Sequence, residues 1–202
     1  TAPLITFAHQ DNYVAGSCGV AVKHMEVKVL SDDPENVAGE LVCRGINVMK
    51  GYYKMPEATA ATVDKEGWLH SGDLACRDEN GCYRITGRLK DMIIRGGENI
   101  YPKEIEDFIY THPKVQDVQV IGVPDKLKMQ KVKAFVMLKP GVPADDNTKR
   151  ELLDYCRKHV AKYAMPYDIE FRDELPKTLV GKVAYRVLEE DAAMASERGA
   201  EE

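Results

Sequence analysis

The pattern of apolar residues changes near Lys90, and this change restricts the fold more than any other feature of the sequence. Before it, short apolar and β-branched runs alternate with tight turns, as at 20–22, 25–30 and 40–43. Several short strands at this spacing are typical of a small barrel or sandwich. We therefore expect residues 1–89 to form a small β-rich, barrel-like subdomain.

Two local signals refine this expectation. Pro56 suits the first turn of a helix and alanines follow it, so a short helix is predicted over 56–62. Asn80-Gly81 lies between two apolar runs. Because Asn-Gly readily supplies the two positive φ values of a type I′ turn, the sequence predicts a tight β-hairpin here.

Beyond the boundary, the sequence predicts a helix, two strands and a second helix. Pro102 suits the first turn of the first helix, whose apolar face would contain Ile105, Phe108 and Ile109. Apolar runs at 115–123 and 132–138 flank the charged turn 125–128, a pattern expected of antiparallel strands.

The second helix is predicted from a capping box. Thr148 and Glu151 have the required spacing, which places the start of the helix at Thr148. Its buried side is expected to contain Leu152, Tyr155, Cys156, His159 and Val160. Residues 189–202, rich in alanine and charge, are expected to fray or to continue a terminal helix. Together these elements predict an α+β domain over 90–202.

The composition argues against several classes of function. A formal net charge of -5 does not favour nucleic-acid binding, which requires clustered Lys and Arg. The five cysteines are scattered, and neither they nor the five histidines have metal-ligand spacing, so we expect no metal site in this chain. Reduced cysteines favour a cytoplasmic protein. No apolar run approaches the roughly 18 residues that a transmembrane segment needs.

Three side chains are candidates for chemistry. Asp73 follows Gly72, and its carboxylate could accept hydrogen bonds from two adjacent hydroxyls, as on a ribose, or could cap its own backbone turn. Arg88 carries a rigid fork of donors that suits a phosphate, a sugar oxygen or a surface salt bridge. Lys182 follows a glycine in a bent loop, where its flexible ammonium could follow charge between a carboxylate and a phosphate. Taken alone, a lysine at this position is more typical of a solvated surface residue.

Gly96 and Gly97 separate two apolar runs. They could form a plain hairpin turn, or they could let a narrow ligand pass close to the backbone. Both interpretations can hold together.

Four motifs occur in order along residues 39–188. They are Gly39-Glu40-Leu41 with Gly51-Tyr52-Tyr53, Trp68 to Asp73, Gly87 to Glu106, and Leu175 to Lys182. Together they resemble the carboxyl-terminal part of the adenylate-forming acyl-CoA synthetase family, which also contains luciferases and nonribosomal peptide adenylation domains. The resemblance implies an enzyme that uses ATP and Mg²⁺ to convert a carboxylic acid, expected to be a fatty acid, into an acyl-adenylate. The acyl group would then pass to the thiol of coenzyme A.

The resemblance also implies a role for each candidate residue. Asp73 would hold the ribose hydroxyls of ATP, and Arg88 would make a second nucleotide contact. Lys182 would be catalytic, because its charge would bridge the substrate carboxylate and the α-phosphate as they are joined. Gly96 and Gly97 would line the path of the pantetheine arm of coenzyme A.

The family further implies a division of the chain at Lys90. Residues 1–89 would be the last β-rich part of the large adenylating domain, and 90–202 would be a mobile domain that rotates about Lys90 between the two half-reactions. The sequence contains neither the family's phosphate loop nor the glutamate that positions Mg²⁺. We therefore expect a fragment that needs the upstream part of the same enzyme as its partner and is inactive alone.

The sequence departs from the family pattern at three positions. Val180 stands where a threonine is frequent, and Ala184 where a polar residue is common. Met129 replaces a usual glycine in the turn before Val132. The contacts around the lysine loop and the geometry of that turn are therefore open at this point.

Two other functions remain possible from the sequence. The chain could belong to an adenylation module that loads a carrier protein instead of coenzyme A. It could also be an isolated binding or regulatory domain without turnover. Transfer of the acyl group to a carrier but never to coenzyme A would identify the first, and the absence of adenylation in the complete protein would identify the second.

Overall fold

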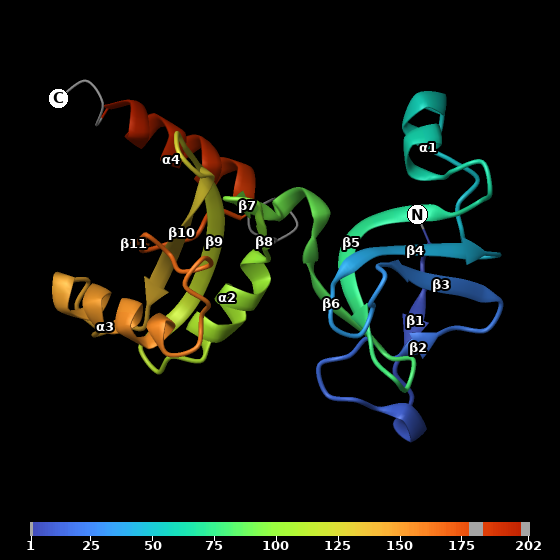
Figure 1. The fold of residues 1–202 in the computed structure, drawn as a ribbon, viewed down its shortest axis with the longest axis horizontal. Helices are drawn as coiled ribbons and strands as arrows, with labels where there is room; N and C mark the ends of the chain where they lie inside the picture. The colour runs from blue at the N-terminus through green and yellow to red at the C-terminus, as the bar shows by residue number, and fades with distance from the viewer. Residues whose placement is uncertain (1, 178–183, 199–202) are drawn as a thin grey trace. The chain divides into compact units, whose positions relative to one another are not determined.

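The computed structural model describes residues 2–177 and 184–198. The chain divides into two compact units, Thr1–Lys90 and Asp91–Glu202, called unit 1 and unit 2 below. Figure 1 labels their helices and strands. In the part of the chain that the structure describes, no helix is long and apolar enough to cross a membrane.

Unit 1 is built on a four-stranded antiparallel sheet. The strands, in spatial order, are β3 (Met25–Leu30), β4 (Gly39–Gly45), β5 (Leu69–Arg77) and β6 (Tyr83–Arg88). The remaining elements are the paired strands β1 (Thr6–Phe7) and β2 (Val20–Ala21), the 3-10 turn η1 (Gln10–Asn12) and the helix α1 (Pro56–Thr62). The strand at 25–30 and the helix at 56–62 are confirmed as predicted.

The sheet of unit 1 is open, and the described residues form no closed barrel. Strands β3 and β6 lie at its two edges, and β1 pairs only with β2 in a separate ladder. Closing a barrel requires the two edge strands to pair with each other, which a path of four strands with this order does not achieve. The barrel-like part of the prediction is therefore not met, whereas the β-rich character is.

The β5–β6 hairpin is confirmed, but its turn differs from the prediction. Arg77 pairs with Tyr83, so five residues connect the strands. Gly81 has a φ of 80°, whereas Asn80 is not among the residues with positive φ. Asp78 accounts for the difference, because its carbonyl accepts the Gly81 N–H at 2.9 Å and its carboxylate accepts the next N–H at 2.8 Å. One left-handed glycine then suffices to reverse the chain.

Unit 2 has an α+β architecture around the long strand β10. Its elements are β7 (Ile93–Arg95), β8 (Glu98–Ile100), α2 (Pro102–Tyr110), β9 (Val115–Asp125), β10 (Met129–Leu138), α3 (Asp146–Arg157), β11 (Asp168–Phe171) and α4 (Tyr185–Arg198). Strand β10 pairs antiparallel with β9, parallel with β11 and, at its first residue, antiparallel with β7. The predicted antiparallel pair of strands is confirmed, and β11 is an addition to the prediction.

Met129 begins β10 in a left-handed conformation, with a φ of 66°. Its side chain is 63% exposed. The turn before Val132 therefore forms with methionine in a backbone conformation that suits glycine, and the side chain packs little in return.

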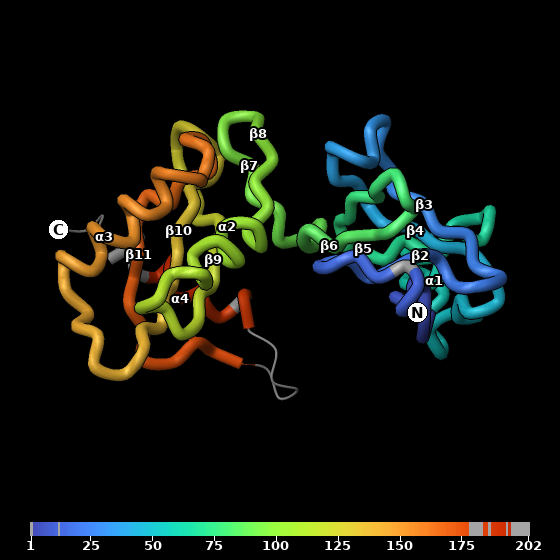
Figure 2. The backbone as a smooth tube through the Cα atoms, turned by 90° about the horizontal axis from the view of Figure 1, so that it is seen from below, coloured from blue at the N-terminus to red at the C-terminus, as the bar shows by residue number. Residues whose placement is uncertain are grey.

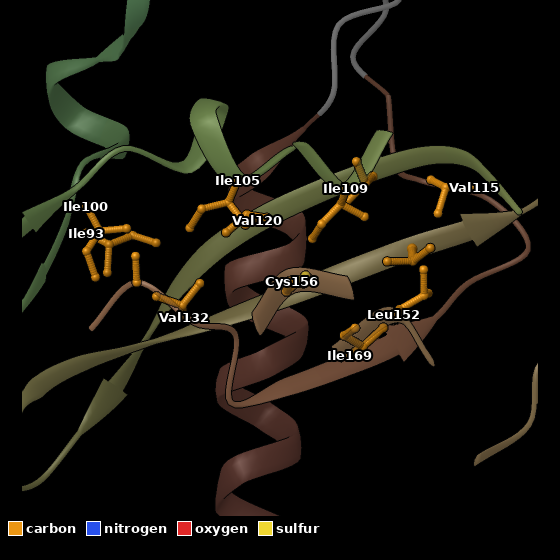
Figure 3. Close-up of a cluster of buried hydrophobic side chains, with 14 residues drawn as sticks. Ile93, Ile100, Ile105, Ile109, Val115, Val120, Val132, Leu152, Cys156 and Ile169 are labelled. Carbon is orange, nitrogen blue, oxygen red and sulfur yellow. The ribbon is translucent and has the colours of Figure 1, made fainter. Parts of the chain in front are cut away.

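Helices cover both faces of the β9–β10 pair. On one face, Ile105 and Ile109 of α2 and Leu152 of α3 join a core cluster with alternate strand residues (Figure 3). On the other face, Leu188 of α4 packs with Phe135 in a second cluster. Figure 1 shows α4 on the side of the sheet opposite α3. The alternation of side chains along β10 gives each helix layer an apolar face to cover.

The start of α3 differs from the prediction. The N-cap is Asp145, whose carboxylate accepts the Thr148 N–H at 2.8 Å, so the helix begins three residues before the predicted cap. Both Asp and Thr are good N-caps, and the sequence spacing alone did not choose between them. The helix ends at Arg157, and His159 lies beyond it and is exposed, so its predicted burial is wrong.

Candidate functional site

Asp73 and Arg88 face each other on neighbouring strands. They are cross-strand partners on β5 and β6, and Asp73 Oδ1 lies 3.0 Å from Arg88 Nε. The side chains are 29% and 52% exposed, so both remain accessible from solvent. An ion pair this exposed stabilises a fold by only about 0–1 kcal/mol. The structure thus brings together the two residues assigned to the nucleotide, and it also forms the salt bridge that was the alternative for Arg88.

A bulge in β5 sets the position of Asp73. One residue of β4, Leu41, lies opposite three residues of β5, 71–73. Gly72, inside the bulge, has a φ of +71°, and a Cβ added there would meet nothing within 4 Å. The backbone conformation, and not a lack of space, therefore requires glycine before Asp73. Bulges of this kind re-aim a side chain relative to the regular ladder.

Gly96 and Gly97 form the turn of the short β7–β8 hairpin, drawn in green in Figure 2. Their φ values are +62° and +90°, and a Cβ added to either would meet nothing within 4 Å. Two consecutive positive φ values are those of a type I′ turn, which joins two strands tightly. The hairpin interpretation is confirmed, and the open space beside both glycines leaves the turn accessible.

Hydrogen bonds from its own backbone and side chains tie this hairpin to two other loops. The Gly96 N–H donates to the Lys128 carbonyl at 3.1 Å. The Arg95 guanidinium donates to the Tyr163 carbonyl at 2.7 Å. The glycine turn is therefore held in place from both sides within unit 2.

Lys90 lies in the 3-10 turn η2 (Leu89–Asp91), where unit 1 ends and unit 2 begins. Lys182 and Val180 lie outside the described residues. The two flanks of their segment are described, and the Ala184 N–H donates to the Pro176 carbonyl at 2.8 Å. Leu175, just before it, is 5% exposed and belongs to the core cluster beneath α4.

Sequence reasoning did not single out a buried acid in the third motif. Glu106 on α2 is 4% exposed, and its carboxylate accepts the Val120 N–H at 2.9 Å and the Tyr185 O–H at 3.1 Å. Burial raises the pKa of the Glu106 carboxyl, and these hydrogen bonds oppose that rise. Burial and the Glu106 charge together raise the pKa of the Tyr185 phenol. The position of Glu106 directly after Ile105, on the apolar face of α2, was the signal that could have indicated its burial.

Within 2–177 and 184–198, no three His, Cys, Asp or Glu side chains are arranged to hold a metal ion. All five cysteines are free. Cys156 is fully buried, and burial raises the pKa of its thiol to about 11, so it is a packing residue.

Comparison with known proteins places this geometry in a family. Residues 104–182 match the family described as AMP-binding enzyme C-terminal domain, and residues 1–53 match the AMP-binding enzyme family. The chain is 43% identical over 202 residues to the putative acyl-CoA synthetase YngI of Bacillus subtilis, covering 96% of this chain and 36% of that protein. It is 44% identical over 197 residues to a long-chain-fatty-acid–CoA ligase of Escherichia coli O157:H7, covering 95% of this chain and 34% of the ligase. The chain belongs to the adenylate-forming, AMP-binding enzyme family.

Solved structures agree with membership of the adenylate-forming family. The anthranilate CoA ligase AuaEII in complex with anthranoyl-AMP is 32% identical, with a TM-score of 0.84 over 94% of this chain and 37% of that one. ATP-bound MatB from Rhodopseudomonas palustris is 36% identical, with a TM-score of 0.79 over 87% of this chain and 35% of that one. The chain therefore corresponds to the carboxyl-terminal portion of an adenylate-forming enzyme, and it spans about a third of the length of the relatives it matches.

Proposed function

We propose that this chain is the carboxyl-terminal part of an ATP-dependent acyl-CoA synthetase. The complete enzyme would form an acyl-adenylate from a carboxylic acid, with a fatty acid as the substrate class, and would then transfer the acyl group to coenzyme A. In this proposal residues 1–89 complete the large adenylating domain, and residues 90–202 form the mobile domain. The similarity to fatty-acid–CoA ligases supports the choice of substrate class.

The observation that carries the proposal is the pairing of Asp73 with Arg88. An ionised carboxylate accepts hydrogen bonds only, which suits the two neighbouring hydroxyls of a ribose. Arg88, at 3.0 Å from Asp73, would orient the carboxylate and present its remaining donors to the nucleotide. Both side chains are partly exposed, so the residues present fit this part of ATP.

Lys182 is proposed as the catalytic cation of the adenylation step. Two anions, the substrate carboxylate and the α-phosphate, repel each other as they approach. An ammonium between them offsets that repulsion where charge concentrates in the transition state. Mg²⁺, held by residues outside this chain, would neutralise further phosphate charge.

The Gly96–Gly97 turn is proposed to serve the second half-reaction, in which the thiol arm of coenzyme A reaches the acyl-adenylate. Open space beside both glycines supports this role, because a narrow pantetheine arm can approach the backbone only where no side chain stands in its way. Lys90 would be the hinge about which unit 2 rotates between the two half-reactions. The rotation would bring Lys182 to the active centre for the first and the Gly96–Gly97 turn for the second.

The adenylation step is tested by ATP–pyrophosphate exchange with a fatty acid. We expect exchange in the complete protein and none in the chain alone. Lys182→Ala in the complete protein should reduce exchange by about 10²- to 10³-fold, since one charge-stabilising donor is lost. Lys177→Ala, five residues earlier in the sequence, is the matched control and should leave the rate unchanged. Exchange by the isolated chain, or full exchange by Lys182→Ala, would contradict the proposal.

The acceptor step is tested with synthetic acyl-adenylate. Lys182→Ala should still convert it to acyl-CoA, whereas Gly97→Leu, which places a side chain in the turn, should not. Acyl transfer to a holo-carrier protein but never to coenzyme A would instead favour an adenylation module. No adenylation by the complete protein with any carboxylic acid would favour a binding or regulatory domain.

A further inference from the structure

Side chains hold the bulge that presents Asp73 where the register of β4 and β5 is interrupted. Opposite it, the Leu41 carbonyl accepts the Ser71 hydroxyl at 2.6 Å. The same hydroxyl oxygen accepts the Asp73 N–H at 3.0 Å. The Gly72 N–H donates to a Glu40 carboxylate oxygen at 3.1 Å. The side-chain hydrogen bonds that hold the bulge on its β4 side thus come from Ser71 and Glu40.

Glu40 makes two contacts on the segment that leads into Asp73. One carboxylate oxygen accepts the Gly72 N–H, and the other lies 2.8 Å from His70 Nδ1. Since a carboxylate only accepts hydrogen bonds, His70 must carry its proton on Nδ1 in this arrangement. The Glu40 side chain is 15% exposed, against 36% for His70, so the carboxylate is shielded from competing water.

Glu40 is not needed for the ladder that surrounds the bulge. Its own backbone pairs with Leu74 in the regular register of β4 and β5. Its side chain, by contrast, reaches across to the two residues that fix the path of the chain immediately before Asp73. Loss of the carboxylate would leave the Gly72 N–H without this acceptor while the rest of the sheet keeps its bonds.

We propose that Glu40 is a positioning residue for nucleotide binding, which acts by fixing the bulge and so aims the Asp73 carboxylate toward the ribose. The inference rests on the proposed function of Asp73. His70 assists by orienting the Glu40 carboxylate, and Ser71 holds the other side of the bulge. Glu40 itself does not touch the nucleotide.

The test measures KM for ATP and kcat by pyrophosphate exchange in the complete protein. Glu40→Ala removes both contacts and should raise KM for ATP about tenfold with kcat changed by less than about twofold, the equivalent of one lost hydrogen bond to a charged group. Glu40→Gln keeps an acceptor for the Gly72 N–H and loses the charge, so KM should rise only about threefold. Glu26→Gln is the matched control, because Glu26 pairs with Arg44 on the same sheet away from the bulge and KM should not change.

A double-mutant cycle separates positioning from direct binding. If Glu40 acts through Asp73, the double variant Asp73→Ala/Glu40→Ala should have the same KM for ATP as the single variant Asp73→Ala. Additive increases would overturn the inference. So would a lower midpoint of thermal unfolding for Glu40→Ala and Glu40→Gln with KM for ATP unchanged, which is the result of a purely structural role.

Failure of the inference and failure of the proposed function give different results. If Asp73→Ala leaves KM for ATP unchanged, the nucleotide role of Asp73 is wrong. If Asp73→Ala raises KM but Glu40→Gln and Ser71→Ala do not, only the positioning role is wrong. Should Glu40→Ala not fold, these last two variants still decide the matter, since each keeps one side of the bulge intact.

Discussion

Removing the Tyr185 hydroxyl should destabilise unit 2 by an amount that depends on pH. The O–H donates to Glu106, a carboxylate that is 4% exposed and accepts one further bond from the Val120 N–H. A hydrogen bond to a charged group contributes about 1.5–3 kcal/mol, and a bond between neutral groups about 0.5–1.5 kcal/mol. Tyr185→Phe should therefore cost about 1.5–3 kcal/mol while Glu106 is ionised, and about half as much once it is protonated.

The direction of the pH dependence follows from burial. Burial raises the pKa of Glu106 above its value in the unfolded chain, so the Glu106 contribution to the free energy of unfolding is fully present below the unfolded pKa. That contribution is lost as the pH rises through the folded pKa. Without the Tyr185 donor the folded pKa rises further, so the variant loses more than the wild type over the same window. The difference between the two should grow as the pH rises from the unfolded pKa of Glu106 through its raised folded pKa.

Urea unfolding followed by two signals provides the assay. Circular dichroism of helices reports mainly on α2, α3 and α4 of unit 2, whereas Trp68, the only tryptophan, reports on unit 1 and should not respond. Tyr155→Phe is the matched control, because its hydroxyl lies 2.8 Å from the neutral Thr111 hydroxyl and its cost should not vary with pH. An equal cost of Tyr185→Phe at both ends of the pH range, or the same pH dependence in Tyr155→Phe, would refute the reasoning.

Three further predictions follow from single side chains. Met129→Gly should stabilise unit 2 by about 0.5–1 kcal/mol in urea unfolding, because it relieves a φ of 66° at a largely exposed side chain, whereas Met129→Ala keeps the Cβ and should give no gain. Asp145→Ala should destabilise by about 1 kcal/mol through loss of the N-cap of α3, and Asp146→Ala, one residue later, should cost clearly less. Exposed Cys18 should react quickly with iodoacetamide near neutral pH while Cys156 stays unmodified in the folded chain, and rapid labelling of Cys156 would contradict its burial.

Local signals in the sequence predicted most elements of both units. Pro56 and Pro102 each mark the first turn of a helix, because proline lacks an N–H that this position does not need. The strand at 25–30 and the β9–β10 pair were also recognisable from their apolar patterns. The short parallel strand β11 was not, since four residues carry too little pattern to be distinguished from a loop.

The candidate site could be predicted in its residue types but not in its assembly. Asp73 and Arg88 were identified separately, and each had an alternative as a capping or surface residue. Their contact depends on the register of β5 and β6, which shifts once between Leu74 and Ala75. The role of Glu40 depends on a second bulge, opposite Leu41. Bulges change which residues face each other, and no periodic pattern in the sequence records them.

The sequence by itself determined the family, the change from β-rich to α+β structure near Lys90, and the identities of the residues proposed for ATP and coenzyme A. Only the tertiary structure decided that β3 to β6 form an open sheet, that Asp145 begins α3, and that Glu106 lies buried against the edge strand β9. The reason is physical. Propensities and motifs act over a few neighbouring residues, whereas burial and register depend on which distant segments pack together.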